Sequence, residues 1–200
     1  MDVIRIVNGE LETNSYLIVA GKEAIVIDPA TQMVKTKVDD LGVDVIAIIN
    51  THGHFDHIGG NRFFSVPIYI HTLDAPMLTD PNLNLSIHFS LPIISPPANH
   101  IFSEDERLSI GPFDIEVIHT PGHTLGSISL RIDYALFTGD TLFKGNIGRT
   151  DLPGGDYEAM QSSLLKLASL PGDLTIYAGH GEITLLKHEL ESNPFLCELL

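Results

Sequence analysis

The chain has 200 residues, and its 11 Lys and Arg against 26 Asp and Glu give a formal net charge of −15. This charge repels phosphate backbones and anionic lipids, so nucleic acid and membranes are not expected partners. Apolar runs such as residues 45–49 are far too short to cross a bilayer. A single Cys, Cys197, cannot form an internal disulfide, so we expect a cytoplasmic protein. The length of the chain predicts one domain over residues 1–200.

Short apolar runs bounded by Gly, Pro, Asn or Asp recur along the chain and predict buried or half-buried strands. In chain order the predicted strands are residues 3–7, 15–19, 24–27, 43–49, 67–70, 113–118, 126–132, 135–137 and 174–178. Between residues 81 and 97 no periodicity is evident, and a loop of that length is typical of a lid or of the wall of a site.

Helical spacing of apolar residues separates some of these strands. The first predicted helix, residues 31–41, has an apolar side made of Met33, Val34, Val38 and Leu41. The second, residues 156–170, has Asp156 as N-cap and a buried stripe of Met160, Leu164, Leu165, Leu167 and Ala168. A third, residues 183–191, ends before Asn193-Pro194. Strands and helices in this order predict an α/β or α+β sandwich with helices covering sheets.

The strongest chemical signal is segment 51–60, Thr-His-Gly-His-Phe-Asp-His-Ile-Gly-Gly, directly after a predicted buried strand. His and Asp are costly to desolvate unless they are paired or bind a metal. His52 and His54 are two residues apart, so in extended chain both imidazoles project to one side and can hold one ion. Asp56 and His57 follow where the chain must turn and can reach a second ion. The two glycines that follow let the backbone pass close to the site.

Three later residues repeat this pattern, each in a Gly-rich turn after an apolar strand: His123, Asp140 and His180. Ligands at strand ends converge on one rim of a sandwich. Together the segments supply five His and two Asp, which suffice for two ions that share a carboxylate.

With these seven residues at these positions, the sequence resembles the metallo-β-lactamase superfamily, and the resemblance extends from residues 27–29 to residues 193–195. The resemblance implies a four-layer αββα sandwich with the site on one edge of its two sheets. It also implies a ligand set in which Asp140 bridges a first metal, held by His52, His54 and His123, and a second, held by Asp56, His57 and His180.

Within the superfamily the chain looks most like glyoxalase II, hydroxyacylglutathione hydrolase, through residues 120–124, 139–143 and 148–155. Full-length members carry a further helical domain after the last metal His, whereas only 20 residues follow His180, so no C-terminal glutathione-binding domain is expected here. The resemblance implies a thioesterase that uses a metal-bridging hydroxide. Its substrate would be S-lactoylglutathione or a related small-molecule acylthiol, with glutathione as the candidate thiol carrier. Asp56 would orient this hydroxide, and zinc, iron and manganese all suit such mixed ligands.

Residues outside the ligand set are open to two interpretations. Arg149 either binds a substrate carboxylate or pairs with Asp151 or Asp156 to hold its loop. Lys144 and Phe143 are candidates for the same substrate-binding wall. Hydrogen bonds from three further residues would fix His tautomers, or would only cap turns: Asp28, Thr51 and Thr124. Of the other His residues, His119 lies near the site, and surface or loop packing is expected for His71, His88, His100 and His188.

Other activities remain open on the same fold. Persulfide dioxygenases look similar and use one iron, which His52, His123 and Asp140 would hold here. Less favoured are a nuclease of the superfamily, which the net charge disfavours, and a metal-binding protein without catalysis, which the intact ligand set disfavours. Asp140 occupies the position of the lactamase-type Cys ligand, which argues against the β-lactamase branch that uses it.

Overall fold

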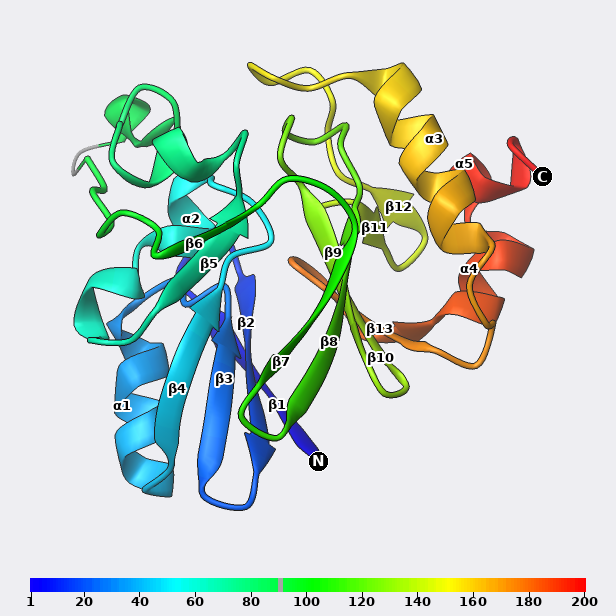
Figure 1. Cartoon of the computed structure of the whole chain (residues 1–200). Coiled ribbons are helices and arrows are strands. Elements are labelled where there is room, and N and C mark those ends of the chain that lie inside the picture. The colour runs from blue at the N-terminus through cyan, green and yellow to red at the C-terminus, as the bar shows by residue number, and fades with distance from the viewer. Residues whose placement is uncertain (90–91) are drawn as a thin grey trace.

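The computed structural model describes residues 1–89 and 92–200 and contains two six-stranded sheets packed face to face (Figure 1). The first sheet has the order β1 (Asp2–Asn8), β2 (Thr13–Ala20), β3 (Glu23–Ile27), β4 (Asp44–Ile49), β5 (Ile68–His71) and β6 (His100–Phe102). The second has the order β14 (Thr184–Leu185), β13 (Thr175–Ala178), β10 (Ala135–Gly139), β9 (Ile128–Ile132), β8 (Phe113–His119) and β7 (Glu106–Ile110). A small hairpin pairs β11 (Leu142–Phe143) with β12 (Asn146–Ile147).

Alternating side chains along the strands divide the apolar residues between two faces, because successive residues of a strand point to opposite sides. Tyr16 and Ile18 of β2 enter the core between the sheets, where they meet residues such as Phe137 of the second sheet. Leu17, between them in sequence, packs on the outer face of the first sheet. A near-continuous apolar run such as that of β2 therefore belongs to a strand that is buried on both faces of its sheet.

Helices cover both outer faces, which gives the four-layer αββα sandwich that the resemblance predicts (Figure 1). Helix α1 (Gln32–Leu41) packs on the first sheet, and α3 (Tyr157–Ala168), α4 (Leu186–Ser192) and α5 (Pro194–Cys197) pack on the second. A short helix, α2 (Phe55–Ile58), follows β4. Among residues 1–89 and 92–200, no helix has the length and hydropathy needed to span a bilayer.

The predicted apolar faces of the helices are wider than the faces that the sheets cover. Val34 and Val38 of α1 are buried, but Met33 is 49% exposed and Leu41 is 40% exposed. In α3 the buried stripe is Met160, Ser163, Leu164 and Leu167, and Ala168 packs partly buried against the same core, so the prediction was wrong only for Leu165. Residues one position apart differ by about 100° around a helix, and a helix on a sheet buries only the stripe that faces it. Asp156 is the N-cap of α3, as predicted, and accepts from the Ala159 N–H.

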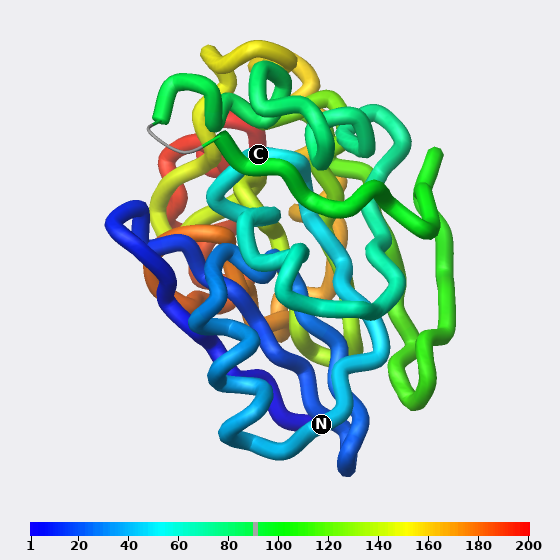
Figure 2. The backbone as a smooth tube through the Cα atoms, turned by 90° about the vertical axis from the view of Figure 1, so that its left-hand side faces the viewer, coloured from blue at the N-terminus to red at the C-terminus, as the bar shows by residue number. Residues whose placement is uncertain are grey.

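Strands of one direction end at one edge of the two sheets, and the predicted ligands follow four of them: β4, β8, β10 and β13. Parallel pairing gives β3, β4 and β5 the same direction in the first sheet. In the second sheet β10 is parallel to β13, and β8 shares their direction because both β8 and β10 pair antiparallel with β9. Figure 2 shows the segment around residues 75–89, in green, at the end of the molecule opposite the N-terminus, near this edge.

Candidate metal centre

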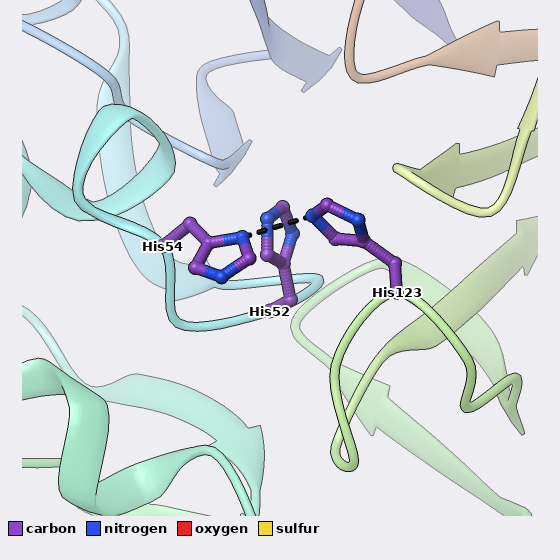
Figure 3. Close-up of side chains that lie close together, drawn as sticks. All are labelled: His52, His54 and His123. Atoms are coloured by element: carbon purple, nitrogen blue, oxygen red, sulfur yellow. Dashed lines mark hydrogen bonds between the residues drawn. The ribbon is translucent and has the colours of Figure 1, made fainter. Parts of the chain in front are cut away.

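Three histidines form one part of the candidate centre, the buried half, defined as His52, His54 and His123. The first two lie in the extended loop after β4, and His123 lies in the loop between β8 and β9. Their ligand atoms lie within 4.8 Å of one another, and His54 Nδ1 is 2.9 Å from His123 Nε2. Figure 3 shows the three rings converging from the two loops, and their centroids are 4.7 to 4.9 Å apart. All three side chains are buried.

The other part, the open half, consists of Asp56, His57 and His180. Asp56 and His57 lie in the first turn of α2, and His180 follows β13. Asp56 Oδ2 is 3.5 Å from His57 Nε2 and 3.4 Å from His180 Nε2. The side chains of Asp56 and His180 are 15% and 27% exposed, so this half meets solvent.

Asp140, in the turn after β10, lies between the two halves. Its Oδ2 is 3.6 Å from His123 Nε2 of the buried half and 3.5 Å from His180 Nε2 of the open half. Its Oδ1 is 3.5 Å from His57 Nε2. A Cβ at Gly179 would lie 2.1 Å from this Oδ1, so only glycine fits beside the carboxylate. The structure thus brings all seven predicted ligands together.

Unpartnered polar atoms test whether these residues suit metal ions. Within the described residues, His52 Nε2 and Asp140 Oδ1 are buried and make no hydrogen bond. A buried polar atom without a partner costs about 1–3 kcal/mol, and coordination of a cation removes that cost. Imidazole and carboxylate are the ligands that zinc, iron and manganese accept. The donor set therefore fits divalent cations.

The two halves differ in their protonation. Burial and the neighbouring His57 lower the pKa of His52 far below its usual range, and burial followed by His123 lowers the pKa of His54 to about 3. Burial also opposes the charged form of His57, but the Asp56 and Asp140 carboxylates outweigh it and raise the pKa of His57 to about 10. Metal ions bind the neutral imidazole. At neutral pH His52 and His54 therefore have the neutral form that binds a metal, whereas a cation that binds His57 must displace its proton.

Backbone and carboxylate acceptors orient the rings. His57 Nδ1 lies 3.0 Å from Asp28 Oδ2, His180 Nδ1 lies 3.0 Å from the Leu11 carbonyl, and His123 Nδ1 lies 2.8 Å from the Arg149 carbonyl. Each contact leaves the Nε2 atom free to face the centre.

Asp28 and Thr51 have the orienting position that the sequence left open. Asp28 accepts from the Thr51 N–H at 2.7 Å and from its Oγ1 at 2.6 Å, and Thr51 Oγ1 is 3.2 Å from His52 Nδ1. Thr124 instead donates to Asp74, so it reaches the histidines only through the loops.

Asp74, just after β5, is a functional candidate that the sequence analysis missed. Its carboxylate accepts from the Gly53 N–H at 2.9 Å, the Thr124 hydroxyl at 2.7 Å and the Gly126 N–H at 2.8 Å. It thereby ties the loop of His52 and His54 to the loop of His123. Burial raises the pKa of Asp74 although these donors oppose the rise. Its position after a strand was the available signal, but no glycine or histidine marks it.

A cavity of about 610 Å³ opens above the centre. His54, Asp56, His123, Asp140 and His180 lie along it, and its walls are largely apolar, with Leu11, Phe55, Leu85, Phe89, Phe143, Ile147 and Leu152. The Phe55 and Phe89 rings are 4.3 Å apart, and the Phe55 N–H donates to the Asn84 carbonyl at 3.1 Å. The cavity therefore offers an apolar surface next to polar chemistry.

The predicted loop 81–97 forms one wall of this cavity through Leu85, His88 and Phe89, while residues 90–91 of the loop lie outside the described residues. His88 is an exposed residue of this loop, as expected, and lies at the edge of the cavity. His119 stacks on His71 with ring centroids 4.1 Å apart and contacts the Leu125 carbonyl. The two glycines after α2 pass close to the carbonyls of residues 29–31.

The predicted substrate residues lie in different places. Phe143 and Arg149 line the cavity. Arg149 makes two hydrogen bonds to Asp151, at 2.7 and 2.8 Å, which is one of the two predicted pairings. Lys144 pairs with Glu182 and lies outside the set of residues that line the cavity.

Known proteins share this sequence and architecture. The metallo-β-lactamase superfamily model matches residues 8–180. The probable metallo-hydrolase YqgX of Bacillus subtilis is 35% identical and covers 94% of each chain. The hydroxyacylglutathione hydrolase GloC of Haemophilus influenzae is 37% identical and covers 88% of each chain.

Solved structures agree with these relatives. BLEG-1, a B3 metallo-β-lactamase, has a TM-score of 0.94 at 38% identity over 98% of this chain and 99% of that one. TTHA1623 in a di-iron-bound form has a TM-score of 0.85 at 34% identity over 97% of this chain and 100% of that one. ETHE1 from Myxococcus xanthus has a TM-score of 0.79 at 28% identity over 97% and 84%. The chain belongs to the metallo-β-lactamase superfamily.

Proposed function

We propose that the protein is a dinuclear metal-dependent hydrolase that cleaves small-molecule thioesters, with S-lactoylglutathione or a related acylthiol as substrate. The observation that carries the proposal is the position of Asp140, whose two carboxylate oxygens face the buried half and the open half within 3.6 Å. One carboxylate between two ligand clusters is the arrangement that a pair of cations requires.

In this proposal His52, His54 and His123 hold one cation, Asp56, His57 and His180 hold the other, and Asp140 contacts both. Two divalent cations would activate a water molecule and polarise a carbonyl oxygen, which supplies several kcal/mol of charge stabilisation. Asp56 is placed to orient the attacking water. The Thr13 hydroxyl donates to its Oδ2 at 2.9 Å and holds the carboxylate in place.

The choice of a thioester rests on the cavity and on one relative. A thiolate leaves without strong acid assistance, which suits a cavity walled mainly by apolar side chains such as Phe55, Phe89 and Phe143. These walls would receive the apolar part of the substrate, and Arg149 would face its polar part. GloC, named as a hydroxyacylglutathione hydrolase, supports the same reaction. For the metals we propose zinc or iron, with manganese as a further candidate, and the di-iron form of TTHA1623 supports iron.

Two other activities have specific support. The likeness to ETHE1 favours persulfide dioxygenation, which would use one iron at His52, His123 and Asp140. The likeness to BLEG-1 favours β-lactam hydrolysis. Dioxygenation leaves the convergence of Asp56, His57 and His180 without a role, so we favour the two-metal hydrolase.

A substrate panel tests the proposal. Protein reconstituted separately with Zn²⁺, Fe²⁺ and Mn²⁺ is assayed on S-lactoylglutathione, glutathione persulfide and a chromogenic cephalosporin, with and without oxygen. We expect thioester hydrolysis at equal rates in both atmospheres, and its loss in Asp140→Ala. Turnover of the persulfide alone, and only with oxygen, would establish the dioxygenase instead. Turnover of the cephalosporin alone would establish a β-lactamase.

A further inference from the structure

A second hollow lies beside the metal centre and has no role in the chemistry described so far. It has a volume of about 360 Å³ and shares Leu11, Phe55 and Asp56 with the cavity above the centre. We name it the Arg62 pocket; its further lining includes Glu10, Gln32, Arg62 and Phe63. The two hollows are therefore adjacent, with Leu11, Phe55 and Asp56 between them.

Arg62 is the basic residue of this pocket. It lies in the short turn Asn61–Phe63 that follows α2, and its guanidinium carbon is 5.0 Å from the centre of the Phe63 ring. A cation over an aromatic face is held in place at low entropic cost, and its N–H groups stay free for a ligand.

The ion pairs of neighbouring residues single out Arg62. Arg149 of the main cavity is paired with Asp151, and Lys144 nearby is paired with Glu182. Two arginines, Arg62 and Arg149, are among the described residues that line the two hollows. Arg62 is the one without a carboxylate within 4.0 Å. A guanidinium without a partner in a chain of net charge −15 is a specific local feature, not part of a general basic surface.

Several other polar residues of the pocket already have hydrogen-bond partners. The Thr31 hydroxyl donates to Asn8 Oδ1 at 2.8 Å, and the Asn8 amide donates to the carbonyls of Ile6 and Thr13. Asp56 is turned towards the metal centre, where it accepts from the Thr13 hydroxyl and lies beside His180. The Arg62 guanidinium is thus available to a ligand. Glu10, in the exposed turn between β1 and β2, lines the same pocket and would compete with an anionic ligand for it.

We propose that the Arg62 pocket binds a carboxylate at the far end of the substrate, so that the protein selects thioesters with an anionic arm. This inference rests on the proposed thioesterase function and adds the substrate class. A guanidinium binds a carboxylate through two parallel N–H···O bonds, which gives both affinity and orientation. The carboxylate can belong to the acyl arm or to the thiol arm, and the experiment separates the two.

The experiment uses four thioesters in a two-by-two design on the metal-loaded protein. The acyl arm is hexanoyl or adipoyl, which differ in a terminal carboxylate, and the thiol is glutathione or its diethyl ester. We expect the carboxylate on one arm to lower KM about tenfold against the counterpart that lacks it, as one charge-assisted contact does. In Arg62→Met this difference disappears while kcat for the substrate without a free carboxylate stays within about twofold. Arg62→Lys restores part of it.

Matched controls keep the test specific. Arg107→Met removes an exposed arginine of β7 from a different surface, and it should preserve the carboxylate preference. Glu10→Gln removes the competing charge, so KM for the preferred carboxylate substrate should fall a further twofold or more. A rise in KM for Glu10→Gln would show that the pocket recognises an ammonium group, and would overturn the proposal.

Binding without turnover separates this inference from the proposed function. Calorimetry compares S-hexylglutathione with its diethyl ester, and 6-(hexylthio)hexanoate with its ethyl ester, on the wild type and on Arg62→Met. A carboxylate preference that depends on Arg62 supports the pocket even if no thioester is hydrolysed. Equal KM and affinity for charged and neutral compounds, or a preference that survives Arg62→Met, would contradict the pocket while leaving thioester hydrolysis intact.

Discussion

The buried half and the open half of the candidate centre are built in different ways. In the buried half three histidines lie away from solvent, and Asp74 ties their two loops together through three hydrogen bonds. In the open half Asp56 and His180 meet solvent while His57 is buried, and Asp28 and the Leu11 carbonyl orient the two rings. Burial keeps His52 and His54 neutral, whereas neighbouring carboxylates favour a protonated His57.

This difference indicates a division of work. His52 and His54, which burial keeps neutral, bind a cation without releasing protons, and their surroundings exclude competing water. An open set that contains Asp56 exchanges water and contacts the substrate. We therefore expect the buried half to retain its metal more tightly. Five substitutions test this division.

Asp140→Ala acts on both halves at once and should have the largest effect. Removal of the shared carboxylate should lower kcat/KM for a thioester by on the order of 10³-fold, because charge stabilisation by two cations is worth several kcal/mol. Metal analysis after gel filtration should show fewer than two equivalents per chain. A variant that keeps both metals and the wild-type rate would remove Asp140 from the mechanism.

Gly179→Ala places a methyl group 2.1 Å from Asp140 Oδ1 and 2.8 Å from His57 Cε1. The carboxylate must move, and displacements of about 1 Å can cost on the order of 10²-fold in rate. Gly172→Ala is the matched control, because its added carbon meets only Lys187 at ordinary contact distance. Equal activity in the two variants would show that the position of Asp140 is not tightly constrained.

Asp28→Asn and Asp74→Asn separate a residue that supports both halves from one that supports the buried half alone. Loss of a residue that orients a ligand typically costs about 10- to 100-fold in metal affinity or activity. Asp28→Asn should weaken both metals, because Asp28 contacts His57 and also holds Thr51 beside His52, whereas Asp74→Asn should weaken only the more tightly held one. Stepwise removal by a chelator, followed by metal analysis, distinguishes them. The same removal profile for both variants would mean that the halves are not separate.

Phe89→Ala should have the smallest effect and should act on neither half. It removes one face of the aromatic pair with Phe55, so KM for a thioester with an apolar acyl group should rise several-fold through lost apolar contact area. The metal content and kcat should stay unchanged. A fall in metal content would instead assign the 81–97 wall a part in holding the centre.

The seven clustered side chains were predictable because each signal is local. Costly residues such as His52 and Asp140 stand in Gly-rich turns directly after apolar strands, and strands of one direction end at one edge. Asp74 was not predictable, because its role depends on backbone N–H groups of two loops that only the fold brings together.

Tertiary context also decided the remaining differences. Strand β7 escaped prediction because most of its residues are exposed, and edge strands carry polar side chains. The burial of Ser163 instead of Leu165 depends on how α3 lies on its sheet, since the Ser163 hydroxyl donates to the Pro121 carbonyl at 2.7 Å. Composition and periodicity do not specify such contacts.

Titration of the metal-free protein with Zn²⁺, Fe²⁺ or Mn²⁺, while thioester hydrolysis is followed, tests the central claim most directly. We expect the activity to rise until two equivalents of metal are bound per chain, and the second equivalent to contribute most of the rate. Full activity at one equivalent, or no hydrolysis of any thioester at two, would contradict it.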